Sequence, residues 1–274
     1  MRGSAWTPLI HAVLIANALL VLVPMVIMGL SAFKTTREIF QNPFGLPAVW
    51  RIENFSRVWV EARFGTYIQN SVLVTVLSVA VLVAFGAMAG YALGRFRFKG
   101  NDLLYLYFLS GLMLPIRLAI IPLFILMRNL NLLDSPWSLV LIYAASGLPS
   151  AIFILTGFFK TLPADLDSAA RIDGASEWSI FTQIMLPLVR PALVIVTVYN
   201  AIPIWNDFFF PLVFIQTEAR KTLPQGMTVF FGQYFTDYAT LFSGLTLAAI
   251  PIVVLYVILS QHFIRGLTAG AVKG

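Results

Sequence analysis

The sequence predicts an all-α protein that crosses a membrane six times. Hydrophobic residues make up 59% of the 274-residue chain and charged residues only 11%, with a mean hydropathy of +0.86. A soluble domain has roughly 25% charged residues. The apolar segments show no alternation of the kind found in outer-membrane strands, so helices must satisfy the backbone hydrogen bonds inside the membrane.

Six segments supply, or nearly supply, the about 20 apolar residues that a helix needs to cross the hydrocarbon core. They are residues 9–33, 67–93, 103–127, 138–159, 188–214 and 241–263. The third is interrupted by Pro115, Arg117 and Pro122, and the fifth carries Asn206 and Asp207. The first is too long for the apolar region of a signal peptide, so we interpret it as a mature transmembrane helix.

Basic residues in the connections predict the orientation. Six spans place both termini on one side, and the short connection after the second span carries Arg95, Arg97 and Lys99, which favours the cytoplasm. Residues 34–63 carry five bases on the opposite side, but this connection is longer and also carries three glutamates. We give the short connection more weight, so the termini and residues 162–187 are expected in the cytoplasm.

Two connections are then expected outside. Residues 34–66 contain turn signals at Asn42-Pro43 and Leu46-Pro47 and a short surface helix over residues 52–60. Residues 217–237 form the second external connection, with Pro224-Gln-Gly226 at its centre.

The longest polar segment that can form helices is residues 162–187, LPADLDSAARIDGASEWSIFTQIMLP, called here the polar segment. Its helical periodicity is interrupted once, at Asp173-Gly174. Gly174 can end one helix, and Ser176 can cap a second with Glu177 in its first turn. We predict two short helices at an angle. They could dock in a groove on another protein, or they could form an amphipathic linker on the membrane surface.

The polar segment resembles the EAA loop of ABC importer permeases, whose pattern is E-A-A, three residues, G, nine residues and I-x-L-P. Ser168 stands at the leading glutamate of that pattern, which puts one ion pair with the ATPase in doubt, although an exposed pair is typically worth only about 0–1 kcal/mol. Asp165 or Asp167 could replace it. The resemblance implies that the residues which couple to a cytoplasmic ATPase are Ser168, Ala169, Ala170, Asp173, Gly174, Ala175, Ile184, Leu186 and Pro187.

Further motifs extend the resemblance over residues 64–274. They are Asn70-Ser71, Tyr91–Phe98, Leu114-Pro115, Ile121-Pro122-Leu123, Leu148-Pro149, Trp205-Asn-Asp207, Pro211-Leu212 and the end of the chain from Arg265 to Gly274. They resemble the carbohydrate-uptake branch, and within it the second permease of maltose-type importers. The implied domains are residues 1–65, with the first span and external loop, residues 66–264, the type I core, and residues 265–274, a cytoplasmic tail.

The resemblance also implies partners and a location. The expected complex lies in the bacterial inner membrane and contains a second, different permease, two ATPase subunits and an extracytoplasmic solute-binding protein. The tail residues expected to reach into the ATPase dimer are Gly266, Leu267, Thr268, Gly270 and Lys273. The implied function is a permease subunit that imports a carbohydrate or related polyhydroxylated solute by alternating access.

Catalytic and cofactor patterns are missing from the sequence. It has no G-x-x-x-x-G-K-[ST] motif, so ATP and Mg²⁺ must be used by partner subunits. It has no cysteine, and neither of its two histidines belongs to a metal motif, so no metal site is expected. The bases are thinly spread between apolar runs, which argues against binding nucleic acid. A membrane-embedded enzyme would need a catalytic constellation that we do not find.

Polar residues inside the spans are costly and are therefore candidates for function. Arg117, Asn206 and Asp207 could line a translocation pathway, or they could form a hydrogen-bond network that holds kinked helices. The alternative function is a secondary carrier or channel that uses Asp207 as its coupling site.

Overall fold

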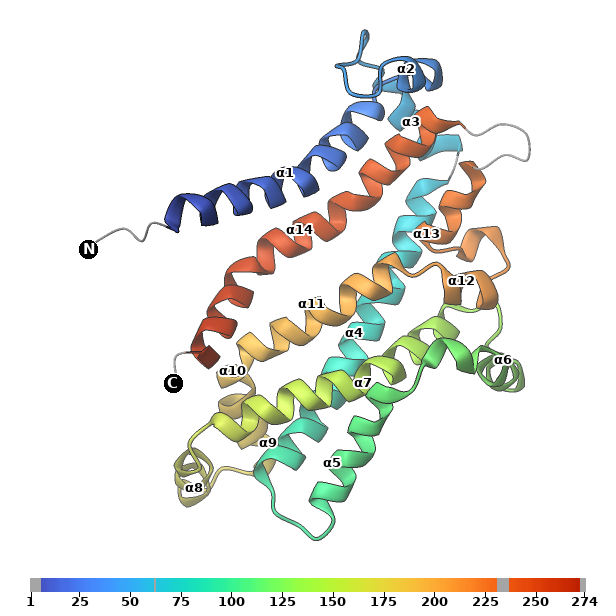
Figure 1. The fold of residues 1–274 in the computed structure, drawn as a ribbon. Helices are drawn as coiled ribbons and strands as arrows, with labels where there is room; N and C mark the ends of the chain where they lie inside the picture. Colours follow the sequence, from blue (N-terminus) through green and yellow to red (C-terminus); the bar gives the residue numbers. More distant parts are fainter. Residues whose placement is uncertain (1–5, 62, 231–236, 272–274) are drawn as a thin grey trace. The chain divides into compact units, whose positions relative to one another are not determined.

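The computed structural model describes residues 6–61, 63–230 and 237–271, with the backbone alone for Glu61, Val229 and residues 259–271. Within these ranges every regular element is a helix and no strand occurs, which confirms the predicted fold class (Figure 1). The chain forms two compact units. One contains residues 1–65 and 226–251, and the other contains residues 66–225 and 252–274.

Four described helices are long and apolar enough to cross a membrane: α1 (Thr7–Ser31), α4 (Phe64–Arg95), α7 (Pro136–Thr161) and residues 238–258 of α14 (Tyr238–Ala271). Two bent pairs raise the number to six if each pair is one span. Residues 101–113 and 116–129 meet at 82°, and residues 177–188 and 190–206 meet at 74°. The predicted number of six spans is the upper value that these residues allow.

The third span is broken at Pro115, as predicted, whereas Pro122 lies within the helix α6 (Ile120–Asn129) and does not interrupt it. The span consists of α5 (Asn101–Ser110), η1 (Gly111–Met113), η2 (Ile116–Ala119) and α6. Arg117, a polar residue of the third predicted span, therefore lies in a short 3₁₀ turn beside the bend and not inside a continuous helix.

The fifth span was predicted as one helix over residues 188–214, and this is also wrong. α11 (Arg190–Asn206) ends before Asp207, whose backbone is extended with ψ 128°, and α12 (Phe209–Phe214) follows. At the break, Asp207 Oδ2 accepts a hydrogen bond from the backbone N–H of Phe210, in the first turn of α12, at 3.0 Å.

The first unit is built from α1, α2 (Thr36–Gln41), α3 (Glu53–Glu61), η5 (Met227–Phe230) and the start of α14. The buried amide of Asn54 donates to the carbonyls of Ala32 and Lys34, at 3.0 Å each. The short helix expected over residues 52–60 is confirmed as α3. The helix α2 was not predicted, although Thr35 and Glu38 have capping-box spacing, and the Thr35 hydroxyl accepts the Glu38 N–H at 3.2 Å.

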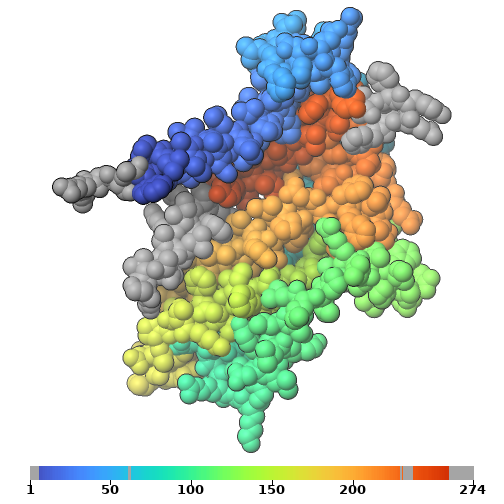
Figure 2. Space-filling model, in the orientation of Figure 1, coloured from blue at the N-terminus to red at the C-terminus, as the bar shows by residue number. Residues whose placement is uncertain are grey.

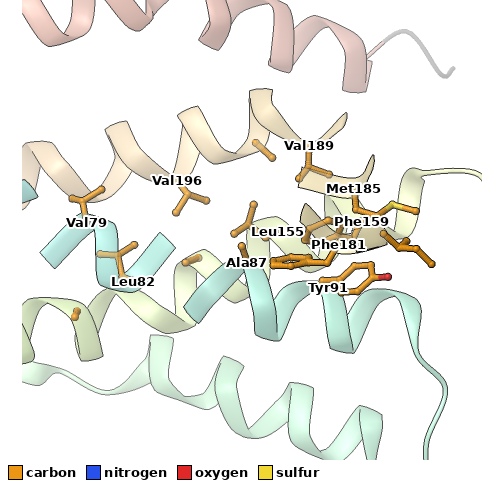
Figure 3. Close-up of a cluster of buried hydrophobic side chains, with 14 of the residues drawn as sticks. Val79, Leu82, Ala87, Tyr91, Leu155, Phe159, Phe181, Met185, Val189 and Val196 are labelled. Carbon is orange, nitrogen blue, oxygen red and sulfur yellow. The ribbon is translucent and has the colours of Figure 1, made fainter. Parts of the chain in front are cut away.

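The second unit is held together by close packing of α4 against α7. Three glycines, four residues apart, lie on the α4 face that meets α7. A Cβ atom at Gly86, Gly90 or Gly94 would lie 2.7–3.0 Å from side chains of α7. Such small-residue spacing lets two helices approach closely in a membrane. The resulting core also includes α11 through Val196 and Ala201 (Figure 3).

At one end of this unit, the carboxylate of Asp134 joins the α6–α7 connection to the residues that follow α12. Asp134, between α6 and α7, accepts hydrogen bonds from the backbone N–H groups of Gln216 and Thr217, both at 2.9 Å, and pairs with Arg220 at 3.2 Å. Within this unit, α6 and α12 lie at the end opposite to α8 and α9 (Figure 1).

Candidate functional site

The polar segment forms the angled pair of helices that its sequence predicts. α8 (Asp165–Ile172) is followed by its C-cap Asp173 and then by Gly174, which has φ +81°. A Cβ atom added to this glycine would meet no other atom within 4 Å. The N–H groups of Gly174 and Ala175 donate to the carbonyls of Arg171 and Ala170, at 3.1 and 3.0 Å, which is the Schellman arrangement. The left-handed φ explains why a glycine occupies this turn.

The second helix begins directly after the turn. Ser176 caps α9 (Glu177–Ser179) by accepting the N–H of Ser179 at 3.2 Å. Across the turn, the guanidinium of Arg171 binds the carboxylate of Glu177 in a bidentate pair, at 2.6 and 3.2 Å. Both side chains are exposed, so this pair orients the two helices but adds little stability.

A buried ion pair fastens the polar segment to the membrane helices. Arg95, the last residue of α4, has two guanidinium nitrogens 2.6 Å from Oδ2 of Asp167 in α8. The side chains are only 6% and 8% exposed. The same guanidinium donates to the carbonyls of Leu162 and Pro163, at 2.7 and 2.9 Å, so it binds both the start of the segment and α8.

A second attachment is apolar. After α9 the chain continues as η3 (Ile180–Met185), which is a π-helix, and α10 (Leu186–Leu188). Ile180, Phe181 and Met185 are buried in the core of the second unit. The Phe181 ring lies 5.1 Å from that of Tyr91 on α4, and Tyr91 lies 5.4 Å from Phe159 on α7 (Figure 3). A movement of the polar segment would therefore act on α4 and α7 together.

The polar segment also exposes two large apolar side chains, one of which, Trp178, has its ring 5.6 Å from that of the buried Phe181. Ile172 is 86% exposed and Trp178 is 65% exposed, which is high for large apolar side chains next to a well-packed core. Among the residues that the resemblance assigned to coupling, the exposed ones are Ser168, Ala169, Asp173, Gly174 and Pro187. Ala170 is buried, and Ala175, Ile184 and Leu186 are partly buried. The assigned set thus contains both surface residues and residues that anchor the segment.

The structure separates the two acids that could replace the missing glutamate at Ser168. Asp167 is buried and forms an ion pair with Arg95, whereas Asp165 is exposed. Sequence reasoning used Arg95 for the orientation and as part of the Tyr91–Phe98 motif, and missed its role in holding the polar segment. The two partners lie 72 residues apart, and no spacing in one sequence connects them.

The intramembrane candidates form a second cluster. Asp207 is buried and accepts a hydrogen bond from the Tyr143 hydroxyl at 2.8 Å, and Arg117 lies 3.4 Å from its other oxygen. The Arg117 side chain is 69% exposed, so the ion pair joins a buried carboxylate to a solvent-accessible guanidinium. Asn206 does not join the cluster, because its amide donates to the carbonyl of Ile202 in its own helix.

The C-terminal candidates can be placed only in part. The backbone of residues 266–271 continues α14 and includes Gly266, Leu267, Thr268 and Gly270, while the side chains of this stretch lie outside the described part of the structure. Lys273 lies outside the described residues altogether.

Comparison with known proteins shows the family. Residues 83–269 match the family of the binding-protein-dependent transport system inner membrane component. The diacetylchitobiose uptake system permease protein NgcG of Streptomyces coelicolor is 38% identical over 265 residues, covering 96% of this chain and 88% of that protein. The arabinooligosaccharides transport system permease protein AraQ of Halalkalibacterium halodurans is 34% identical over 261 residues, covering 94% and 93%.

A solved structure has the same fold. It is a chain from the crystal structure of a bacterial ABC transporter involved in the import of the acidic polysaccharide alginate, with a TM-score of 0.83 and 23% identity over 96% of this chain and 98% of that one. The present chain belongs to the family of inner membrane components of binding-protein-dependent transport systems. It is a membrane-embedded permease component with the type I ABC importer fold.

Proposed function

We propose that this chain is one of two permease subunits of an ABC importer for a carbohydrate or related polyhydroxylated solute. Family membership supports the transport role, and the names of the relatives support the substrate class, since they refer to diacetylchitobiose and arabinooligosaccharides. Membership of this family also argues against the secondary carrier or channel that the sequence left open.

The observation that carries the proposal is the construction of the polar segment. It presents Ile172 and Trp178 outward on two angled helices, while Arg95 and Phe181 fasten it to the spans. An amphipathic helix that docks in a groove uses an exposed apolar face of this kind. A linker lying on the membrane surface would not require a buried ion pair to its neighbouring helix.

The chain has no nucleotide-binding motif of its own, so the proposal needs partners. Two cytoplasmic ATPase subunits would bind and hydrolyse ATP with Mg²⁺, and a second, different permease would complete the pathway. The family name supports dependence on a soluble binding protein that delivers the solute.

In the proposed mechanism, closure of the ATPase dimer moves the polar segment as a rigid body. Arg95 transmits the movement to the end of α4, and Phe181 transmits it through Tyr91 and Phe159 to α4 and α7. The spans then change between outward-open and inward-open arrangements, and ATP binding shifts the population between these two states.

The proposed orientation can be tested by labelling. Ser176 lies in the polar segment, and Gln216 follows α12 at the opposite end of the second unit. Both residues are exposed. Because the chain has no cysteine, Ser176→Cys and Gln216→Cys can each be labelled alone. An impermeant thiol reagent added to intact cells should label Gln216→Cys only, and labelling of Ser176→Cys would reverse the orientation.

We also infer that Arg117 and Asp207 lie along the translocation pathway, whereas Asn206, the neighbour of Asp207 in the chain, lines neither of the cavities that support this. Two cavities, of about 310 and 180 Å³, share Ile116, Ser146 and Asn200, and the smaller one is also lined by Arg117 and Asp207. Both adjoin broken helices. Irregular backbone at membrane depth is tolerated where it is buried in protein or lines a cavity, and discontinuous helices commonly line the sites of transporters.

The overall proposal is tested by purifying the chain from its native membrane and identifying what accompanies it. We expect one different permease and two ATPase subunits per complex. In proteoliposomes, a panel of oligosaccharides with the cognate binding protein should contain one that stimulates ATP hydrolysis. A chain that purifies alone and moves solute along an ion gradient would contradict the proposal and restore the carrier alternative.

A further inference from the structure

A polar cavity of about 600 Å³ lies beside the polar segment, between the α4–α5 connection and the end of α7. Three bases line it, Arg95, Arg97 and Lys160, together with two acids, Asp102 and Asp167. We call it the basic cavity. In Figure 2 the α4–α5 connection, in teal at the lower edge, lies beside the yellow segment that contains α8.

Two of the three bases are not neutralised by a neighbour. Arg95 and Asp167 neutralise each other, since they form the buried ion pair. Arg97 and Lys160 are exposed, and among the described residues neither has an acid within ion-pair distance. The Lys160 ammonium lies over the ring of Tyr105, 5.1 Å from its centroid, and Lys160 lines the cavity. Asp102, in the first turn of α5, is the one remaining acid of the lining.

The surroundings of the basic cavity are those of a membrane interface. The connection reads Arg95-Phe96-Arg97-Phe98-Lys99, and Phe96 and Phe98 are partly exposed between the bases. Alternating aromatic and basic residues at the end of a span suit the headgroup region. On α5, directly after Asp102, four large side chains are exposed: Leu103, Leu104, Leu106 and Tyr107. They provide an apolar flank that continues from the cavity along the span.

We propose that the basic cavity binds the phosphate of an anionic phospholipid headgroup, with the acyl chains lying along the exposed flank of α5. The planar guanidinium of Arg97 can bind two phosphate oxygens at once, and Lys160 supplies a second positive charge from the opposite wall. Cytoplasmic membrane surfaces are negatively charged, and basic pockets between spans on that side bind such headgroups. A bound headgroup would bridge the two segments that hold the polar segment in place.

The test counts lipids on the intact transport complex, reconstituted in nanodiscs of phosphatidylglycerol and phosphatidylcholine and released for native mass spectrometry. Arg97→Gln and Lys160→Gln should each lower the phosphatidylglycerol retained per complex several-fold. The matched controls are Arg128→Gln, at the end of α6, and Lys99→Gln, which adjoins the basic cavity without lining it. Both should retain the wild-type number of lipids. Asp102→Asn should raise retention, because it removes the opposing charge.

Equal losses from Lys99→Gln and Lys160→Gln would show a diffuse surface potential and overturn the site. A photoreactive phosphatidylglycerol gives an independent measurement on the unaltered chain, and its adducts should fall within residues 96–102 or on Lys160. Adducts confined to other segments would overturn the proposal, as would an ATPase side chain found in the cavity of the assembled complex. Displacement of the lipid by inorganic phosphate alone would show that the free anion is the ligand, which also overturns it. None of these readouts depends on which solute is transported.

Discussion

Arg95 at the end of α4 and Asp167 in α8 form a buried ion pair in which two guanidinium nitrogens lie 2.6 Å from one carboxylate oxygen. The pair connects a transmembrane helix to the segment proposed to dock on the ATPase. The other oxygen of Asp167 is buried without a hydrogen-bond partner in the described part of the protein, so its charge depends on Arg95.

The first prediction concerns this pair. Arg95→Met should destabilise the protein strongly, by about 3–5 kcal/mol, because it leaves the carboxylate of Asp167 buried and unpaired. Arg95→Met combined with Asp167→Leu should recover most of that stability, since a buried pair can often be replaced by apolar residues. Thermal unfolding of the purified chain in detergent measures both, with Arg128→Met, at the end of α6, as an exposed control. If the double variant is less stable than Arg95→Met alone, the unpaired charge of Asp167 is not the main cause of the loss of stability.

The second prediction concerns the turn at Gly174. Gly174→Val should leave the chain in the membrane but abolish uptake and loosen the ATPase, because a β-branched residue is strained at φ +81°. Gly100→Val is a matched control, since Gly100 has φ +89° and equally open surroundings but lies outside the polar segment. Gly174→Asn should retain activity, because asparagine tolerates this conformation.

Uptake and ATPase co-purification distinguish the outcomes. Normal transport by Gly174→Val would remove the coupling role of the turn. Equal loss in Gly100→Val would show that the defect is general backbone strain rather than a change in the docking surface.

Much of this site could be predicted from the sequence, because its signals are local. Gly174 and Ser176 specify a turn and a cap within a few residues, and the structure contains both. The pairing of Arg95 with Asp167 could not be predicted, since it depends on how α4 packs against the segment 72 residues later.

The fold divides in the same way. The lengths and composition of the apolar segments predicted the uninterrupted spans, and Pro115 predicted the break in the third. The break at Asp207 was missed because the Asp207 carboxylate, besides accepting the N–H of Phe210, contacts Tyr143 and Arg117 from distant segments. The periodicity of apolar residues in the sequence indicates which face of a helix is buried, but it does not indicate contacts between side chains of distant segments.

The third prediction concerns pH. Burial raises the pKa of Asp134, but hydrogen bonds from the Thr217 hydroxyl and from the N–H groups of Thr217 and Gln216, together with Arg220, outweigh it and hold the pKa below its usual range. A lowered folded-state pKa contributes stability that is present above the unfolded pKa, about 3.9, and lost as pH falls through the folded value.

Acidification from about pH 4 downward should therefore cost the wild type more stability than it costs Asp134→Asn. Asparagine is the suitable replacement because Asp134 has φ +54°, a conformation that it shares readily. Thermal unfolding in detergent across this range measures the difference, with Asp165→Asn as a control at an exposed acid. Parallel pH profiles for wild type and Asp134→Asn would show that the charge of Asp134 contributes nothing.

The fourth prediction concerns the C-terminal end. Deleting residues 268–274 removes no part of the apolar span over residues 238–258, so membrane insertion should be preserved. If the tail contacts the ATPase dimer, substrate-stimulated ATP hydrolysis should fall in the reconstituted complex. Unchanged stimulated turnover with unchanged subunit stoichiometry would restrict coupling to the polar segment.

The docking of the polar segment on an ATPase is tested most directly by crosslinking in the assembled complex. A photoreactive probe attached to Ile172→Cys occupies the most exposed apolar position of the segment, and Gln216→Cys carries the same probe at the opposite end of the unit. We predict an adduct between Ile172→Cys and the ATPase subunit, with a yield that changes on adding ATP, and no such adduct from Gln216→Cys. Adducts of Ile172→Cys with lipid alone would show that the segment lies on the membrane surface and would contradict its proposed role in coupling.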